Sequence, residues 1–274
     1  MVTQPRPLAT DDPHLLITRP EPQIAVLTLN RPGARNALSL PLILDVHAAL
    51  LALGDDDTCA AIILAATGSV FSSGHDLKEL TAHRADADGG RAFFQQTMTA
   101  CSAMMQAIVA CPKPIIAVVQ GTATAAGCQL VASADLAVAA DTAQFATPGV
   151  NIGLFCSTPM VALSRNVPRK RAMEMLLLGE ALSAQDAATY GLVNRMVASD
   201  QVSATALDYA RRIAAKSKST VAVGKAAFYR QIEAPLYQAY EDASAIMVAN
   251  MMSWDANEGI CAFIEKRDPV WKDQ

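Results

Sequence analysis

The continuous apolar run at residues 115–119, Ile-Ile-Ala-Val-Val, constrains the fold of this 274-residue chain more than any other feature of its sequence. The run is rich in β-branched residues, and it lies between Pro114 and Gly121. A short segment that is apolar at every position is typical of a strand buried on both faces, as in a parallel sheet covered by helices. The sequence therefore predicts a central strand of such a sheet.

Strands and helices alternate along roughly the first 200 residues, which indicates an α/β protein. We expect strands at 15–18, 24–29, 60–64, 115–119, 136–139 and 193–197, with 68–76 as a loop. We expect helices at 39–53 with Ser39 as cap, 90–110, 128–134, 168–178 before Gly179, and 183–191 behind a capping box. After about residue 202 the pattern is helical, at 204–216, 221–252 with a break at Pro235, and 255–266.

The composition indicates a large buried surface. Hydrophobic residues make up 52% of the chain and charged residues only 18%, which is below the usual quarter for a soluble domain. Subunit contacts are the simplest place for the additional buried area. We therefore predict a loose, proline-rich tail at 1–13, a core at 14–200, and a helical region at 201–274 that makes a homo-oligomer.

The charge and cysteine patterns exclude several functions. The net charge is -4 without any Lys/Arg block, so we expect no nucleic-acid partner. No apolar run has the length of a signal-peptide core or a membrane span, so we expect no membrane contact and a cytoplasmic protein. The six cysteines are scattered without metal-ligand spacing, which predicts buried free thiols in a reducing compartment and no metal site.

Two segments, Val70–Lys78 and Lys113–Leu130, combine a strand, small residues and the start of a helix. Both can present backbone N–H groups that have no partner, and the N–H groups at a helix start carry partial positive charge. Two such donors can bind one oxygen that gains negative charge, and each can contribute about 3–4 kcal/mol to a transition state. Alternatively, the small residues only allow a helix and a strand to pack closely.

The two segments also resemble the crotonase, or enoyl-CoA hydratase/isomerase, family. Further motifs follow in the order of that family over residues 15–267: Asn30-Arg-Pro with Asn36-Ala-Leu, Ala143 to Pro148, Pro168 to Gly179, Leu182 to Ala187, Gly191-Leu-Val and Glu258 to Arg267. Phe71 to Leu77 and Gly127 to Ser133 are similar to a subgroup called enoyl-CoA hydratase domain-containing proteins. The resemblance implies a spiral fold of repeated ββα units with a helical C-terminal extension, assembled as a trimer or hexamer.

The resemblance also implies a ligand and its contacts. The substrate would be an acyl-coenzyme A thioester of fatty acid metabolism, with no permanently bound cofactor. The N–H groups of His75 and Ala126 would hold the thioester oxygen, and Phe263 and Lys266 of a neighbouring subunit would cover the ribose phosphate. The full set of implied CoA contacts is Arg35, Ala37, Ser73, His75, Asp76, Leu77, Lys78, Ala126, Phe263 and Lys266.

The sequence departs from this family where hydratases carry two glutamates that activate water. Gln129 and Gly149 stand at those positions, and neither residue can accept a proton near neutral pH. Loss of one positioned acid or base costs about 100- to 10,000-fold in rate. We expect very weak hydration, and isomerisation, thioester hydrolysis, decarboxylation and non-catalytic acyl-CoA binding stay open. A peptidase on the same scaffold would need an activated Ser/His/Asp set, for which the sequence has no motif.

Three further residues carry alternatives. A helix start at Ser157 would lower the pKa of Cys156 and make it a nucleophile, while the alternative is a buried packing thiol. His75 could exchange a proton near the thioester, although we expect its side chain to face solvent or a phosphate. Asp76 could act as an acid, but the resemblance makes it a residue that fixes the loop beside the adenine site.

Overall fold

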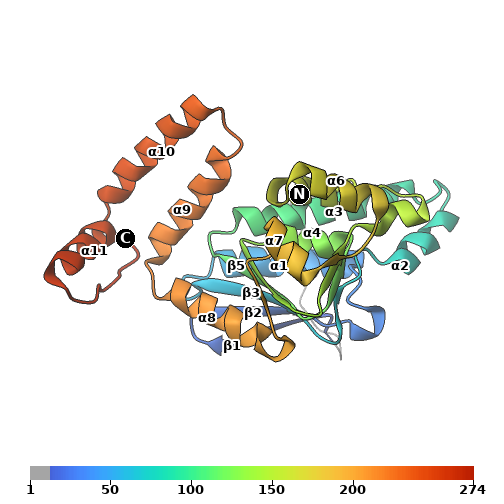
Figure 1. The fold of residues 1–274 in the computed structure, drawn as a ribbon, viewed down its shortest axis with the longest axis horizontal. Helices are drawn as coiled ribbons and strands as arrows, with labels where there is room; N and C mark the ends of the chain where they lie inside the picture. The colour runs from blue at the N-terminus through green and yellow to red at the C-terminus, as the bar shows by residue number, and fades with distance from the viewer. Residues whose placement is uncertain (1–12) are drawn as a thin grey trace.

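The computed structural model describes residues 13–274, and its centre is a six-stranded sheet in the order β1-β2-β3-β5-β7-β10 (Figure 1). All neighbouring strands are parallel except β1 and β2, which are antiparallel. Residues 1–12, with most of the expected tail, lie outside the described residues. The strands of this sheet are β1 (Leu15–Glu21), β2 (Ile24–Leu29), β3 (Ala61–Ala66), β5 (Ile115–Val119), β7 (Leu136–Ala140) and β10 (Arg195–Val197).

A second, four-stranded sheet has the order β4-β6-β8-β9. Its strands are β4 (Val70–Ser72), β6 (Thr122–Thr124), β8 (Gln144–Ala146) and β9 (Leu182–Ser183). Three times in succession the chain adds one strand to the large sheet, the next to the small sheet, and then forms helical structure. These units begin at β3, β5 and β7, and they confirm the expected spiral of ββα repeats.

The helices are α1 (Leu40–Gly54), α2 (Leu77–Ala82), α3 (Arg91–Ala110), α4 (Ala126–Ser133), α5 (Pro159–Asn166), α6 (Arg169–Leu178), α7 (Ala184–Tyr190), α8 (Val202–Ala214), α9 (Lys218–Gln231), α10 (Leu236–Met251) and α11 (Trp254–Glu265). Helix α8 packs against β3, β5 and β7, and α1 packs against α3. The core between these layers is apolar, and Phe71 and Phe145 are its largest fully buried side chains.

Several expected boundaries are wrong. The segment expected as a loop at 68–76 contains β4, and β1 continues to Glu21 through Pro20. Pro20 is tolerated because β1 is an edge strand with a register irregularity between Thr18 and Glu21. Ser39 precedes α1 without a side-chain cap bond, and Glu79 Oε2 accepts from Leu40 N at 2.9 Å instead.

Other helix ends follow the sequence signals. Ser183 Oγ accepts from Asp186 N and caps α7, as the capping box predicts. Gly179 and Gly191 end α6 and α7 with φ of +64° and +87°, a backbone conformation that glycine adopts without a steric penalty. No helix among residues 13–274 is long and apolar enough to span a bilayer.

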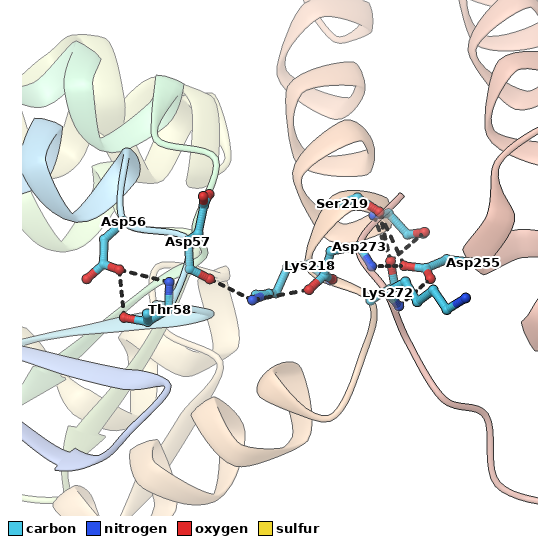
Figure 2. Close-up of polar contacts among 10 residues, drawn as sticks. Asp56, Asp57, Thr58, Lys218, Ser219, Asp255, Lys272 and Asp273 are labelled. Atoms are coloured by element: carbon cyan, nitrogen blue, oxygen red, sulfur yellow. Dashed lines mark hydrogen bonds and ion pairs between the residues drawn. The ribbon is translucent and has the colours of Figure 1, made fainter.

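Helices α9, α10 and α11 stand apart from the two sheets, at one end of the molecule (Figure 1). Many of their large apolar side chains are exposed, among them Phe228, Leu236, Tyr237, Tyr240, Met252, Phe263 and Ile264. At the junction with the core, Lys218 Nζ donates to Asp57 O at 2.6 Å and pairs with Asp273 Oδ2 at 3.1 Å (Figure 2). This contact and the pair between Lys225 of α9 and Asp135 join the extension to the core, while large apolar side chains of the extension are exposed within one chain.

Candidate functional site

The loop after β4 is fixed by an isolated parallel bridge between Leu38 and His75. Leu38 N donates to Gly74 O at 2.8 Å, and Asp76 N donates to Leu38 O at 3.1 Å. In a parallel bridge the middle residue turns its own N–H away from the partner strand. The His75 N–H therefore points away from Leu38, and no acceptor within residues 13–274 takes it.

The second loop is held by a strained residue, Ala125, with φ of +50° and ψ of -119°. Ala125 N donates to Ala146 O at 2.9 Å, so the small sheet fixes this conformation. Helix α4 begins at the next residue, and the N–H groups of the first helical turn have no acceptor within their own helix. The Ala126 N–H is thus a second donor without a described partner, and it follows Ala125, whose backbone conformation costs roughly 1–3 kcal/mol.

The two loops are in direct contact, and glycines allow this. A Cβ placed on Gly74 would stand 2.8 Å from Ala125 Cβ and 3.2 Å from Ala126 N. A Cβ on Gly127 would stand 2.3 Å from Ser72 O. Because Gly74 immediately precedes His75, the loop that carries His75 lies close to the loop that carries Ala126.

Asp76 fixes the first loop. Its carboxylate accepts from Lys78 N at 3.1 Å and Glu79 N at 3.3 Å, which caps α2, and it pairs with Arg31 at 3.0 Å. Partial burial acts to raise the pKa of Asp76, but the hydrogen bonds from Glu79 and Arg31 outweigh it and lower the pKa below its usual value. An ionised, fully engaged carboxylate fits a loop-fixing residue better than an acid catalyst.

The imidazole of His75 is largely enclosed, contrary to the expectation that it faces solvent or a phosphate. Its Nε2 atom is buried and has no hydrogen-bond partner among the described residues. Burial lowers the pKa of His75 to about 4. The ring is therefore neutral near pH 7, with one nitrogen that a ligand can still engage.

The positions of the two missing glutamates bring no carboxylate to this region. Gln129 lies on α4 with 5% of its surface exposed, and its buried Oε1 has no described partner. Gly149 is buried in the short 3-10 helix Pro148–Ile152. Sequence reasoning missed Thr147, which is fully buried and has an unpartnered hydroxyl. The two unpartnered side chains offer hydrogen bonds to a ligand but no proton acceptor of useful basicity.

Cys156 is not the activated thiol that a helix start at Ser157 would produce. Helix α5 begins at Pro159, and Cys156 is buried with 7% exposure. Burial raises the pKa of Cys156, which outweighs the opposing contact with the Gly149 N–H. The thiol is protonated near pH 7, as in the packing alternative. Of the other free cysteines, only Cys261 is more than marginally exposed.

The other residues implied as CoA contacts fall into two groups. Ser73 N donates to Arg35 O at 3.1 Å, which places Arg35 and its neighbour Ala37 beside the first loop. Leu77 and Lys78 are exposed at the start of α2. Phe263, 84% exposed, and Lys266 lie at the end of α11, far from α2 in the same chain (Figure 1). One chain therefore does not bring these two residues to the loops.

Comparison with known proteins agrees with the geometry. The model of the enoyl-CoA hydratase/isomerase family matches residues 19–274. The mouse (Mus musculus) enoyl-CoA hydratase domain-containing protein 3, mitochondrial, is 49% identical over 260 residues, which cover 95% of this chain and 85% of that protein. A probable enoyl-CoA hydratase of Rhizobium meliloti is 31% identical, over 94% of this chain and 97% of that protein.

Solved structures give the same result. The enoyl-CoA hydratase of Mycobacterium smegmatis superimposes with a TM-score of 0.90 at 49% identity, covering 95% of this chain and 99% of that one. The human enoyl-CoA hydratase domain-containing protein 3 superimposes with a TM-score of 0.89 at 46% identity, covering 94% and 100%. These matches confirm the spiral fold and the subgroup to which the sequence motifs point.

The same relatives contradict the prediction of a cytoplasmic protein. The mouse, rat and human proteins all carry the word mitochondrial in their names. The prediction rested on the absence of an apolar run of signal-peptide or membrane-span length, and such an absence does not identify a compartment. From the family match, the relatives and the fold together, the chain belongs to the enoyl-CoA hydratase/isomerase family.

Proposed function

We propose that this protein binds an acyl-CoA thioester and that the N–H groups of His75 and Ala126 together hold the thioester oxygen. The close approach of the loop at Gly74 to Ala126 N supports the proposal, because the N–H groups of His75 and Ala126 are donors without described partners on these two neighbouring loops. Chemical change at the acyl α-carbon places negative charge on that oxygen, and prepositioned amides stabilise it. The strain at Ala125 fits a backbone that is prepositioned for this task.

The residues around the acyl group favour an enzyme that is not an efficient hydratase. Gln129 can orient water or a polar substituent through its amide, but it cannot take a proton from water. Gly149 offers only backbone, and the neutral ring of His75 has a pKa of about 4, which makes it a weak base. The reactions that remain need fewer protein carboxylates, namely isomerisation, hydrolysis or decarboxylation of the thioester.

A non-catalytic acyl-CoA-binding protein is the second candidate. The observation that favours it is the replacement of both glutamates, at Gln129 and Gly149, beside two loops that hold N–H groups without described partners. Such a protein would bind the thioester and release it unchanged.

We further propose that a homo-trimer or hexamer completes the CoA site. Phe263 and Lys266 lie too far from α2 to reach ligand in their own chain, and the apolar side chains of α9 to α11 are exposed. A second copy that covers this surface would bring an aromatic ring and a cation to the ribose phosphate of its neighbour.

Calorimetry with free CoA and several acyl-CoA thioesters, followed by mass spectrometry of the mixtures, tests these proposals. The enzyme predicts binding and at least one altered thioester, while the non-catalytic protein predicts binding and complete recovery of every thioester. Turnover of crotonyl-CoA at the rate of ordinary hydratases would contradict the absence of a working acid and base. Failure to bind any thioester would contradict both candidates.

A further inference from the structure

Neighbouring atoms leave no room for a side chain at Gly149, although the backbone conformation there is one that any residue can adopt. Its φ lies outside the left-handed region, so conformation does not require glycine here. A Cβ at this position would stand 2.8 Å from Leu154 O, 2.9 Å from Cys156 Sγ and 3.3 Å from Cys156 N. Real Cβ atoms essentially never show contacts below 3.0 Å, so a side chain at this position would have to displace Leu154 O and Cys156 Sγ.

The segment that closes this space, residues 154–156, is held at both ends. Leu154 N donates to Gly149 O at 2.9 Å, and Met160 N donates to Cys156 O at 2.9 Å from the first turn of α5. The Gly149 N–H contacts the Cys156 thiol. The segment thus cannot swing away without breaking contacts on both sides.

We propose that Cys156 is a specificity-determining residue of the acyl site, because its thiol, together with Leu154 O, fills the volume that a side chain at position 149 would occupy. This rests on the proposed function, and Ala125 N, which donates to Ala146 O at 2.9 Å, places the segment that leads into the Pro148–Ile152 helix beside the start of α4. The thiol is compact, protonated and a weak hydrogen-bonding group. It therefore makes one wall of the site apolar, and it excludes both an acid or base and a branch on the acyl chain from that side.

One consequence concerns the missing glutamate. Restoring a carboxylate at position 149 alone would force the side chain against Leu154 O and Cys156 Sγ, so the substitution would displace the segment rather than rebuild a hydratase. The change from glutamate to glycine and the presence of Cys156 are then one coupled feature of this chain.

A double-mutant cycle tests the steric claim without any ligand. We expect Gly149→Ala to lower Tm by roughly 3–8 °C through overpacking. We expect the Tm loss of Gly149→Ala with Cys156→Ala to be smaller than the sum of the two single losses, because removal of the sulfur relieves one of the two contacts below 3.0 Å, while the contact with Leu154 O remains. Gly224→Ala is the matched control, since no atom lies within 4 Å of that position, and it should not lower Tm. Strictly additive losses would overturn the proposal.

Calorimetry with acetyl-CoA and the branched isobutyryl-CoA tests the specificity claim, with free CoA as the reference. We expect Cys156→Ala to raise the affinity for isobutyryl-CoA relative to acetyl-CoA by about 10-fold, the lower end of the effect of a methyl-sized space in an apolar pocket. An unchanged ratio would overturn the assignment of Cys156 while leaving the proposed function intact. If the unaltered protein binds none of the three ligands, the proposed function is contradicted. The double-mutant cycle measured by Tm would still decide the steric claim.

Discussion

Ala126 N lies 3.2 Å from the point where a Cβ on Gly74 would stand, so the two loops of the candidate site approach each other closely at these two residues. Gly74 also has φ of +86°, which disfavours any other residue. Both properties favour glycine at position 74, so the close approach of the two loops depends on a residue that has no side chain.

Gly74→Ala should lower Tm more than Gly89→Ala and should reduce acyl-CoA affinity at least 10-fold. Gly89 is the matched control because its φ is +69° but no atom lies within 4 Å of its Cβ position. The difference between the variants isolates the contact with the second loop from the backbone strain common to both. Thermal unfolding and calorimetry measure the two effects, and equal behaviour of the two variants would contradict the role of the contact.

The free energy of unfolding should decrease as the pH is lowered from about 6.5 to about 4, because of His75. Its pKa is lowered from 6.5 to about 4 by burial, so in this window the unfolded chain binds a proton that the folded protein does not. Stability is fully retained above pH 6.5 and decreases as the pH falls, by about 3 kcal/mol at most. His75→Gln should remove this part of the pH dependence of unfolding. An identical pH profile in the variant would show that the ring is not held neutral.

Lys225→Met should cost about 3–5 kcal/mol, because it leaves a buried carboxylate without its partner. Lys225 Nζ pairs with Asp135 Oδ2 at 2.7 Å and donates to Ile108 O and Lys113 O, while Tyr229 OH donates to Asp135 Oδ1. Denaturant unfolding measures the loss. Lys170→Met, at an exposed position of α6, should change stability by less than about 0.5 kcal/mol. Similar losses in both variants would contradict the importance of this buried pair.

Asp255→Asn should loosen the C-terminal extension. The buried carboxylate accepts from Lys272 N at 2.8 Å and Asp273 N at 2.9 Å, and Asp273 in turn pairs with Lys218 at the start of α9 (Figure 2). An amide would place its own N–H group against one of these donors. The terminal residues Lys272 and Asp273 would then be held less tightly beside the start of α9. Hydrogen exchange should then rise in α9 and α11 but not in α8, which packs on the sheet. Asp268→Asn, at an exposed position, is the control. Equal changes of exchange in α8, α9 and α11 would contradict the role of Asp255 in holding the extension.

The sequence predicted the large sheet and most helices because long apolar runs and caps carry strong local signals. It missed β6, β8 and β9, which have only two or three residues each and are stabilised by pairing with segments distant in the sequence. The sequence also predicted too early an end for β1, at residue 18 rather than at Glu21. Whether a strand tolerates Pro20 depends on whether that strand lies at the edge of the sheet. Local patterns do not contain that information.

The candidate site was also predictable only where local sequence patterns carry the information. Small residues around Gly74 and Gly127 indicated the two loops, and the identities of Gln129 and Gly149 showed the missing carboxylates directly. The buried ring of His75, the unpartnered hydroxyl of Thr147 and the thiol beside Gly149 were not predictable. They depend on which segments pack over these residues, and that is a property of the assembled fold.

Vibrational spectroscopy of a bound thioester tests the central claim most directly, because a substitution to proline, which removes a backbone N–H, also changes the backbone conformation of the loop. An acyl-CoA labelled with ¹³C at the thioester carbonyl would be measured by infrared difference spectroscopy, free and bound. Two converging donors predict a carbonyl band at lower frequency in the complex than in water, and Gly74→Ala should reverse much of that shift. A bound thioester whose carbonyl band stays at its position in water would contradict the assignment of His75 and Ala126.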